Sequence, residues 1–432
     1  MRVRKNWVFL SLVISGVLLR AGFVVLANPQ DPTFHSGGSD APAYITLAGN
    51  LLNHQGFRYS GMPSAFRPPG YPLILAGFMQ VFGQHYISAM RFLQFILGLL
   101  TVMICARVSA RWFSGEAGRA TLAIGLLLPT LIFPTAQILT ECIAAFLTAL
   151  FLLFLVEQQE VGGFRSAAAL GITGGLEALI RFNAAALPFF GLWAVWRSKQ
   201  KGGQVVRAGI IVVVTAAVVS PWFIRNEMVF HGAVLYSTHT GANAVQGVVS
   251  TQGRTQPGDT GKLREAMGWT LSELETNDPS RRSLPSELEL NRRALRIVPR
   301  LWKEKGWAAI PLVGRKILDF WLSADQVLDT RMFTTRDRLI RVAGVASYLV
   351  ALALAMAGIN WLRSRRPQIA EIFLLYMVLF TVLHLPLVMN TRLRIPLMEP
   401  LVIILAGVGW AGLFMRDEET NEEREIPRRV MV

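Results

Sequence analysis

The chain has 432 residues, of which 52% are hydrophobic and 16% are charged, and its mean hydropathy is +0.41. Because an average soluble domain carries about 25% charged residues, this composition excludes a disordered chain, a fibrous repeat and an ordinary cytosolic enzyme, and it indicates a protein that crosses a membrane many times. The net charge of +15, with 36 arginines among the 43 basic residues, is typical of basic cytoplasmic anchors and indicates no nucleic-acid partner.

The hydrophobic stretches predict ten membrane spans. The first runs from Trp7 to Ala27, and its length and the interruption by Arg20 favour an uncleaved span over a cleaved signal peptide. Pro134 and Arg181 mark tight turns within two later hairpins. We therefore expect an all-α fold, a polytopic membrane helix bundle of about ten spans. The nine further spans are expected at 86–107, 118–135, 138–156, 166–181, 183–196, 206–225, 340–362, 369–389 and 395–415.

The short loops predict the orientation of the bundle. If the N-terminus is cytoplasmic, the short cytoplasmic segments hold 18 Lys and Arg residues and the short outer segments hold 5. Cytoplasmic loops carry the excess of Lys and Arg, so both termini are expected in the cytoplasm. The protein is then an integral, multi-pass protein of the plasma (inner) membrane. Residues 1–415 form its transmembrane domain, and residues 416–432 form a cytoplasmic tail.

Two long segments, 28–85 and 226–338, lie outside in this topology. In the first, Asp40 precedes apolar residues at helical spacing, which predicts a short helix along the outer membrane surface. Residues 70–82 resemble a second such juxtamembrane helix. In the second segment, amphipathic helices are expected near 261–276, 286–305 and 307–323.

A set of polar residues at the ends of the spans and in the loops gathers at the outer surface in this topology. Familiar soluble motifs, such as a nucleotide-binding P-loop or a zinc-binding HExxH, do not occur. The outward-facing polar set consists of Asp40, Arg67, Glu141, Arg181, Asn183, Arg225, Asn226, Arg392 and Arg394.

Each of these residues also has a purely structural interpretation. An arginine at the end of a span often anchors it at the interface. Asp40 could serve only as a helix N-cap beside Ser39, and Glu141 could cap its span or pair with Arg181. Five outward arginines together with one outward aspartate are harder to explain in this way.

The combination of arginines and a carboxylate suits one reaction. Arginine binds phosphate with two parallel hydrogen bonds, and a carboxylate can accept the proton of an attacking hydroxyl. The set therefore indicates transfer of a sugar from a lipid phosphate, with the arginines stabilising the leaving phosphate.

At these residues the sequence resembles the GT-C superfamily of polytopic membrane glycosyltransferases. It is most similar to the bacterial branch that includes protein O-mannosyltransferases and lipid A aminoarabinose transferases, glycosyltransferase families 39 and 83. The matching pieces occur in family order. They are Asp40-Ala-Pro-Ala-Tyr44, Arg67-Pro-Pro-Gly-Tyr-Pro72, Leu139-Thr-Glu141, Ile180-Arg-Phe182, Pro221-Trp-Phe-Ile-Arg-Asn226 and Arg392-Leu-Arg-Ile-Pro396.

The resemblance implies a polyprenyl-phosphate sugar as donor and an active site on the outer face, with Asp40 as general base. Arg225 or Arg392 is expected to contact the carrier phosphate. Some members carry a second acidic residue beside that aspartate. Here the neighbour is Ser39, so the metal site is undetermined and a divalent cation is the one cofactor left open. Residues expected to bind the carrier phosphate or the sugar are Tyr44, Arg67, Tyr71, Glu141, Arg181, Arg225, Asn226, Arg392 and Arg394.

Two other functions compete with this hypothesis. A flippase or transporter of lipid-linked sugars would use the same ligands, but transporters usually show inverted repeats and midplane sites, and no repeat is visible. An oligosaccharide ligase or polymerase also uses outward arginines, but the surface helix after Asp40 argues against it. The expected partners are the lipid-linked donor, membrane lipids and an acceptor that is a lipid, a glycan or a protein.

Overall fold

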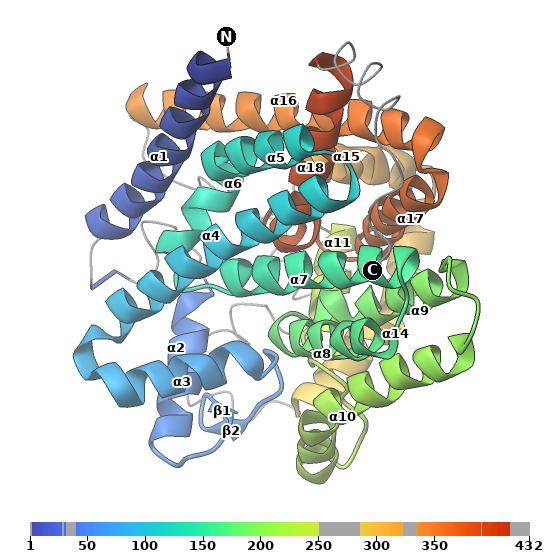
Figure 1. The fold of residues 1–432 in the computed structure, drawn as a ribbon. Helices are drawn as coiled ribbons and strands as arrows, with labels where there is room; N and C mark the ends of the chain where they lie inside the picture. The colour runs from blue at the N-terminus through green and yellow to red at the C-terminus, as the bar shows by residue number, and fades with distance from the viewer. Residues whose placement is uncertain are drawn as a thin grey trace.

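The computed structural model describes residues 2–27, 30–31, 40–249, 286–322, 335–389 and 391–414. The described chain is a helical bundle with one short β hairpin (Figure 1). Its membrane part consists of α1 (Arg2–Leu26), α4 (Tyr86–Trp112), α5 (Gly115–Leu127), α6 (Pro129–Ile132), η2 (Phe133–Ala136), α7 (Glu141–Glu160), α8 (Phe164–Ile180), η3 (Phe182–Ala186), α9 (Leu187–Arg197), α10 (Gln204–Phe230), α16 (Thr335–Arg365), α17 (Pro367–His384) and α18 (Thr391–Phe414).

The remaining elements lie in the two long segments between spans. The hairpin pairs its strands antiparallel, with Arg58 opposite Pro63 and Tyr59 opposite Met62. These elements are α2 (Ala41–Leu52), β1 (Arg58–Tyr59), β2 (Met62–Pro63), α3 (Gly70–Phe82), η1 (Gly83–His85), α11 (Thr240–Val249), α14 (Glu287–Lys305), η5 (Gly306–Ala308) and α15 (Ala309–Leu322).

Helices cover most of each of the ten predicted spans, although fewer stretches are long and apolar enough to be counted as spans by themselves. Among the residues that the structure describes, seven helical stretches are long and apolar enough to cross a membrane, or eight if α5 and the α6–η2 stretch, bent by 69°, form one broken span. Helix α8 has 17 residues and α9 has 11, fewer than the roughly 20 that a perpendicular crossing needs. Small residues let α8 approach α10 closely: a Cβ added at Gly171 would lie 2.9 Å from Val214 Cβ.

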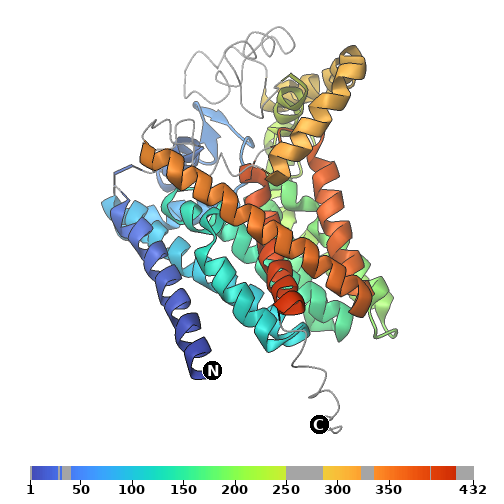
Figure 2. The same cartoon turned by 90° about the horizontal axis from the view of Figure 1, so that it is seen from above.

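The interior of the bundle is organised around α18, which is buried along almost its whole length. It packs against α16, α5, α7 and α4, and α16 crosses it in both views (Figures 1 and 2). Helix α1 lies at the edge and exposes most of its apolar side chains, as expected for a lipid-facing span. Its buried Arg20 donates to the carbonyl oxygens of Leu131 and Gly125 at 2.8 and 2.7 Å, which satisfies carbonyls at the bend between α5 and α6.

The predicted surface elements form as helices. Helix α2 buries Tyr44, Leu47 and Ala48 on one face, as their spacing predicts. Helices α3, α14 and α15 occupy the predicted positions, whereas the helix predicted near 261–276 and the tail 416–432 lie outside the described residues. The β hairpin was not predicted. Figure 2 shows the hairpin and α14 at one end of the bundle and the N-terminal end of α1 at the opposite end.

Candidate active site

Five charged side chains form a continuous series of ion pairs, which we call the ion chain: Arg67, Asp40, Arg392, Glu141 and Arg181. Arg67 Nη2 lies 2.7 Å from Asp40 Oδ1, and Arg392 Nη2 lies 3.1 Å from Asp40 Oδ2. Arg392 Nε lies 3.0 Å from Glu141 Oε1, and Arg181 Nη1 lies 3.4 Å from the same oxygen. The structure thus brings together five residues that the sequence analysis singled out.

Every member of the ion chain comes from the end of a helix or from the segment next to it. Asp40 precedes α2, Glu141 begins α7, Arg181 follows α8, and Arg392 lies in the first turn of α18. The carboxylate of Glu141 is favoured in the first turn of α7 by the positive end of the helix dipole. Thr140 makes no side-chain cap, and its hydroxyl oxygen accepts a hydrogen bond of 2.6 Å from Arg181 Nη1. Helix ends therefore set the positions of the charges.

Asp40 occupies the N-cap position of α2 but makes no capping hydrogen bond with its side chain. Its backbone carbonyl accepts from the amides of Ala43 and Tyr44, while its carboxylate bonds to Arg67 and Arg392. The interpretation of Asp40 as a helix cap alone therefore fails. Its side chain is held by two guanidinium groups instead.

The charges in the ion chain leave one positive charge in excess, because three guanidinium groups meet two carboxylates. Asp40 and Arg392 are the accessible members, with side chains 26% and 25% exposed, whereas Glu141 is 2% exposed. Burial raises the pKa of Asp40, but the nearby cations Arg67 and Arg392 outweigh it and hold that pKa well below its ordinary value. The accessible part of the ion chain is therefore an ionised carboxylate between two arginines.

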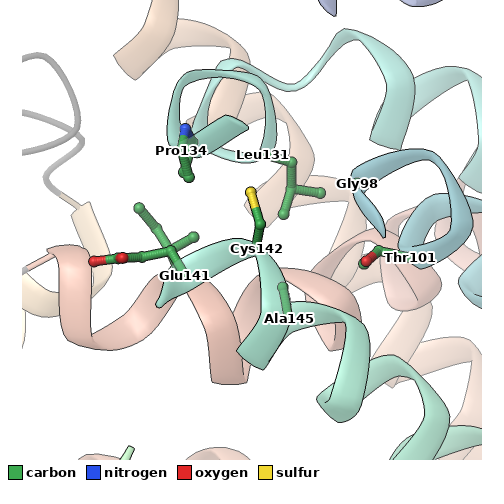
Figure 3. Close-up of a pocket in the computed structure, with 8 residues that line it drawn as sticks. Gly98, Thr101, Leu131, Pro134, Glu141, Cys142 and Ala145 are labelled. Carbon is green, nitrogen blue, oxygen red and sulfur yellow. The ribbon is translucent and has the colours of Figure 1, made fainter. Parts of the chain in front are cut away.

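The second oxygen of Glu141, Oε2, is buried and has no hydrogen-bond partner among the described residues. A largely apolar pocket lies beside this residue. Figure 3 shows Cys142 Sγ pointing toward Pro134 and Leu131, while the carboxylate of Glu141 points away from the cysteine. The pocket is lined by Gly98, Thr101, Leu131, Pro134, Glu141, Cys142, Ala145 and Ile395. An apolar recess thus adjoins the charged site.

Arg225 and Asn226 lie apart from the ion chain. Arg225 donates to the carbonyl oxygens of Ser64 and Phe57 at 2.8 and 2.9 Å, and its guanidinium carbon lies 5.0 Å from the centre of the Trp222 ring. Asn226 is fully buried, accepts from Arg225 and donates to the carbonyl oxygen of Val234. This pair holds residues 57–64, the segment that leads to Arg67.

Arg394 is also separate from the ion chain. It is fully buried, pairs with Glu399 at 2.9 Å, and stacks 3.9 Å from the centre of the Tyr348 ring. The reason is helical geometry, because residues two apart on an α-helix point about 200° apart. Arg392 and Arg394 therefore cannot face the same site from α18.

The two tyrosines and Asn183 border the ion chain or pack behind it. Tyr44 lies with its ring 5.8 Å from the guanidinium carbon of Arg67 and 5.0 Å from the ring of Tyr71. Tyr71 is fully buried and donates its hydroxyl hydrogen bond to Gln94 at 3.1 Å. Asn183 bonds to His384 Nε2 at 3.1 Å. Of the three, Tyr44 lies next to a member of the ion chain.

The sequence analysis missed two residues of the second outer segment. Glu287, in the first turn of α14, accepts hydrogen bonds from Ser64 Oγ, Ala65 N and Thr238 Oγ1 at 2.8 to 3.0 Å. His239 is 5% exposed, and its ring centre lies 4.2 Å from that of Phe66. Burial and the charge of Arg67 lower the pKa of His239 to about 3. No local pattern marks either residue. Ser64 and Ala65 are 223 and 222 residues from Glu287 in the sequence, and the ring partner of His239, Phe66, also lies in the first outer segment.

The sequence leaves open whether the protein binds a divalent cation. Among the residues described, His, Cys, Asp and Glu side chains do not gather in groups of three or more that could hold a metal ion. Both carboxylate oxygens of Asp40 already bond to guanidinium groups.

Comparisons with known proteins agree with the fold. Residues 66–224 match the family described as dolichyl-phosphate-mannose-protein mannosyltransferase. No curated protein matches the sequence. The chain is similar to the archaeal oligosaccharyltransferase AglB from Archaeoglobus fulgidus in complex with an inhibitory peptide and a dolichol-phosphate, with 14% identity and a TM-score of 0.56 over 99% of this chain and 53% of that chain.

A second similar structure is ArnT from Cupriavidus metallidurans bound to undecaprenyl phosphate, with 17% identity and a TM-score of 0.43 over 94% of this chain and 78% of that chain. The chain spans about half the length of the archaeal oligosaccharyltransferase, 53% of it. The fold is that of a predominantly helical, polytopic integral membrane protein. The family match over residues 66–224 supports the resemblance to the GT-C superfamily, and the similar solved structure supports the fold.

Proposed function

We propose that this protein is a glycosyltransferase that moves a sugar from a polyprenyl-phosphate carrier to an acceptor hydroxyl on the outer face of the plasma membrane. The ion chain is the observation that carries this proposal. It combines an accessible carboxylate with arginines at the end of a membrane bundle. The description of the matched family names dolichyl-phosphate-mannose, a lipid-linked sugar, which supports a lipid-linked donor.

Arg392 is the proposed ligand of the carrier phosphate, with Arg181 beside it. Arg392 is partly exposed and reaches both carboxylates of the ion chain, so an incoming phosphate can compete for its guanidinium group. Arg225 suits this role less well, because both of its terminal nitrogens already donate to backbone carbonyl oxygens.

Asp40 is the proposed general base. When the phosphate draws the arginines away from the carboxylate, the pKa of Asp40 rises toward its ordinary value and the carboxylate becomes a better proton acceptor. The acceptor oxygen attacks the anomeric carbon and its proton passes to Asp40. The bond between the anomeric carbon and the phosphate oxygen breaks, and its electron pair stays on the phosphate, where the arginines stabilise the charge.

The experiment that tests this function uses purified protein in liposomes with labelled polyprenyl-phosphate mannose, glucose and pentose donors. We expect one donor class to be consumed with release of polyprenyl phosphate. Movement of an intact donor across the bilayer without release of the carrier would instead indicate a flippase. Transfer of a whole oligosaccharide in preference to single sugars would indicate a ligase.

Replacing Asp40 tests the proposed base. Asp40→Asn keeps the shape of the side chain but removes the proton acceptor, so transfer should fall by about 10²- to 10⁴-fold. Carrier binding and expression should stay near the parental level. Glu289→Gln is the matched control, because this carboxylate is on the exposed face of α14 and pairs with Arg293 one turn away. A fully active Asp40→Asn variant would overturn the assignment.

A further inference from the structure

The two residues that precede His239 are hydrogen-bonded to the segment that leads to Arg67. The amide of Thr238 donates to the carbonyl oxygen of Ala65 at 2.9 Å, and the hydroxyl of Ser237 donates to the carbonyl oxygen of Phe66 at 2.7 Å. The amide of His239 itself donates to Ser237 Oγ at 3.0 Å. These contacts fix the backbone of His239 against that segment, and the imidazole packs on the ring of Phe66 at 4.2 Å.

The imidazole has an unused polar atom in a buried place. The residue is 5% exposed. Its Nδ1 is inaccessible to solvent and has no hydrogen-bond partner among the described residues. A buried nitrogen without a partner is costly, and native proteins seldom retain one unless a ligand or another group satisfies it. The guanidinium carbon of Arg67 lies 4.5 Å from the centre of the same Phe66 ring that contacts the imidazole, and Arg67 pairs with Asp40. The imidazole is therefore close to the proposed general base.

The charge of the ring decides which ligand it suits. Arg67 disfavours a second positive charge nearby, and burial does the same, so His239 is a neutral imidazole. A neutral imidazole has one nitrogen that donates and one that accepts a hydrogen bond. Depending on the tautomer, the unpartnered Nδ1 can donate to a hydroxyl group or accept from one. A phosphate is served better by the arginines of the ion chain.

We propose that His239 binds a hydroxyl group of the substrate, on the transferred sugar or on the acceptor, and thereby orients the reacting centre toward Asp40. The inference rests on the proposed function and deepens it. The ring of Phe66, perpendicular to the imidazole at 67°, forms the wall behind it. His239 is then a substrate-contacting residue supplied by the second outer segment, whereas Asp40 comes from the first.

Substitutions of His239 test the proposal in the same liposome assay. His239→Phe keeps an aromatic ring and removes both nitrogens, and we expect kcat/KM to fall about 10- to 100-fold, the cost of one unmade hydrogen bond at a buried site. His239→Asn restores a donor and an acceptor near the position of Nδ1 and should recover most of the activity. His85→Phe, at an exposed histidine in η1, is the matched control and should behave like the parent.

Two further measurements separate substrate binding from a structural role. Binding of undecaprenyl phosphate without a sugar should be unchanged in His239→Phe, and the thermal midpoint should not fall. A raised KM for the donor would assign the hydroxyl to the sugar, and a raised KM for the acceptor would assign it to the acceptor. The proposal fails if His239→Phe has parental kinetics, if His239→Asn is equally impaired, or if bare carrier binding falls in parallel. If the parent consumes no donor at all, it is the proposed function that fails.

Discussion

At the scale of single residues, Arg392 joins the two carboxylates of the ion chain. Its Nη2 bonds to Asp40 and its Nε bonds to Glu141, which requires a planar group with several separated donors. Arg225 uses its donors on the carbonyl oxygens of Ser64 and Phe57 instead. The two arginines appear equivalent in the sequence, since each lies at the end of a span, yet they serve different purposes.

Conversion of each arginine to lysine should separate these purposes. Arg392→Lys retains the charge but cannot bridge both carboxylates, so transfer should fall at least about 10-fold with little change in thermal midpoint. Arg225→Lys should lower the thermal midpoint more than the donor affinity, because it loses hydrogen bonds and the stacking on Trp222. Transfer kinetics and thermal unfolding in detergent provide the two readouts. Parental transfer by Arg392→Lys would contradict the phosphate assignment.

The neutral state of His239 predicts a pH dependence of stability. Its pKa is about 3 in the folded protein and about 6.5 in an unfolded chain, so below pH 6.5 the unfolded state takes up a proton that the folded state does not. Stability should therefore fall as the pH decreases from 6.5 toward 3, by up to about 1.4 kcal/mol per pH unit from this group. Asp40 contributes only below about pH 3.9, because its folded pKa is lowered.

Thermal unfolding of the parent and of His239→Phe between pH 7 and pH 4.5 would measure this contribution. We expect the variant to lose less stability than the parent over that interval, because the group that titrates on unfolding is gone. Equal pH slopes for the two proteins would mean that His239 is protonated in the folded state.

At the scale of elements, the two outer segments meet along the residues that precede Arg67. Glu287 of α14 accepts three hydrogen bonds, two from residues 64 and 65 and one from Thr238. Thr238 in turn donates its amide to Ala65. One buried carboxylate therefore connects α14 to the segment before α3 and to the segment before α11. Because Arg67 follows the first of these segments, the same carboxylate helps to set the position of Arg67.

Glu287→Gln should loosen this junction. One amide oxygen cannot replace both carboxylate oxygens, so buried donors lose their acceptor at a cost of about 1–3 kcal/mol. We expect a lower thermal midpoint and a weaker donor affinity, the latter because Arg67 is less well positioned. Glu289→Gln, two residues along the same helix but exposed, should change neither. An unaltered midpoint in Glu287→Gln would show that the junction does not depend on this carboxylate.

At the scale of the whole molecule, the ion chain lies near the hairpin and α14, because Arg67 follows the hairpin closely and Glu287 of α14 accepts a hydrogen bond from the amide of Ala65. Figure 2 shows the hairpin and α14 at one end of the bundle and the N-terminal end of α1 at the opposite end. The basic residues of the short loops favour the cytoplasm at that opposite end. The active site therefore faces outward in our proposal, where a lipid-linked donor and an external acceptor can meet.

Cysteine labelling in intact cells tests this orientation. Met62→Cys and Trp307→Cys place thiols on exposed positions, 39% and 87% accessible, in the two outer segments, and both should react with an impermeant reagent added outside. Gly202→Cys, in the loop before α10 where an added Cβ meets nothing within 4 Å, should react only after the cells are opened. The native Cys105 and Cys142 are buried and give little background. The reverse pattern would invert the topology.

Much of this protein can be predicted from the sequence because its determinants are local or compositional. Runs of apolar residues mark spans, short-loop charges predict an orientation, and the spacing of Tyr44, Leu47 and Ala48 predicts the surface helix α2. The members of the ion chain could be listed from the sequence for the same reason, because arginines and carboxylates at the ends of spans are conspicuous against an apolar background.

Only the tertiary structure decided which members of that list act together. Arg392 and Arg394 differ by two positions on one helix, and the helical period alone sends the first to Asp40 and the second to Glu399. Asp40 and Arg392 are 352 residues apart, and no local pattern connects them. The roles of His239 and Glu287 likewise arise from the packing of one outer segment on the other. Long-range packing chooses the partners of a buried charge, and that choice is absent from any single stretch of sequence.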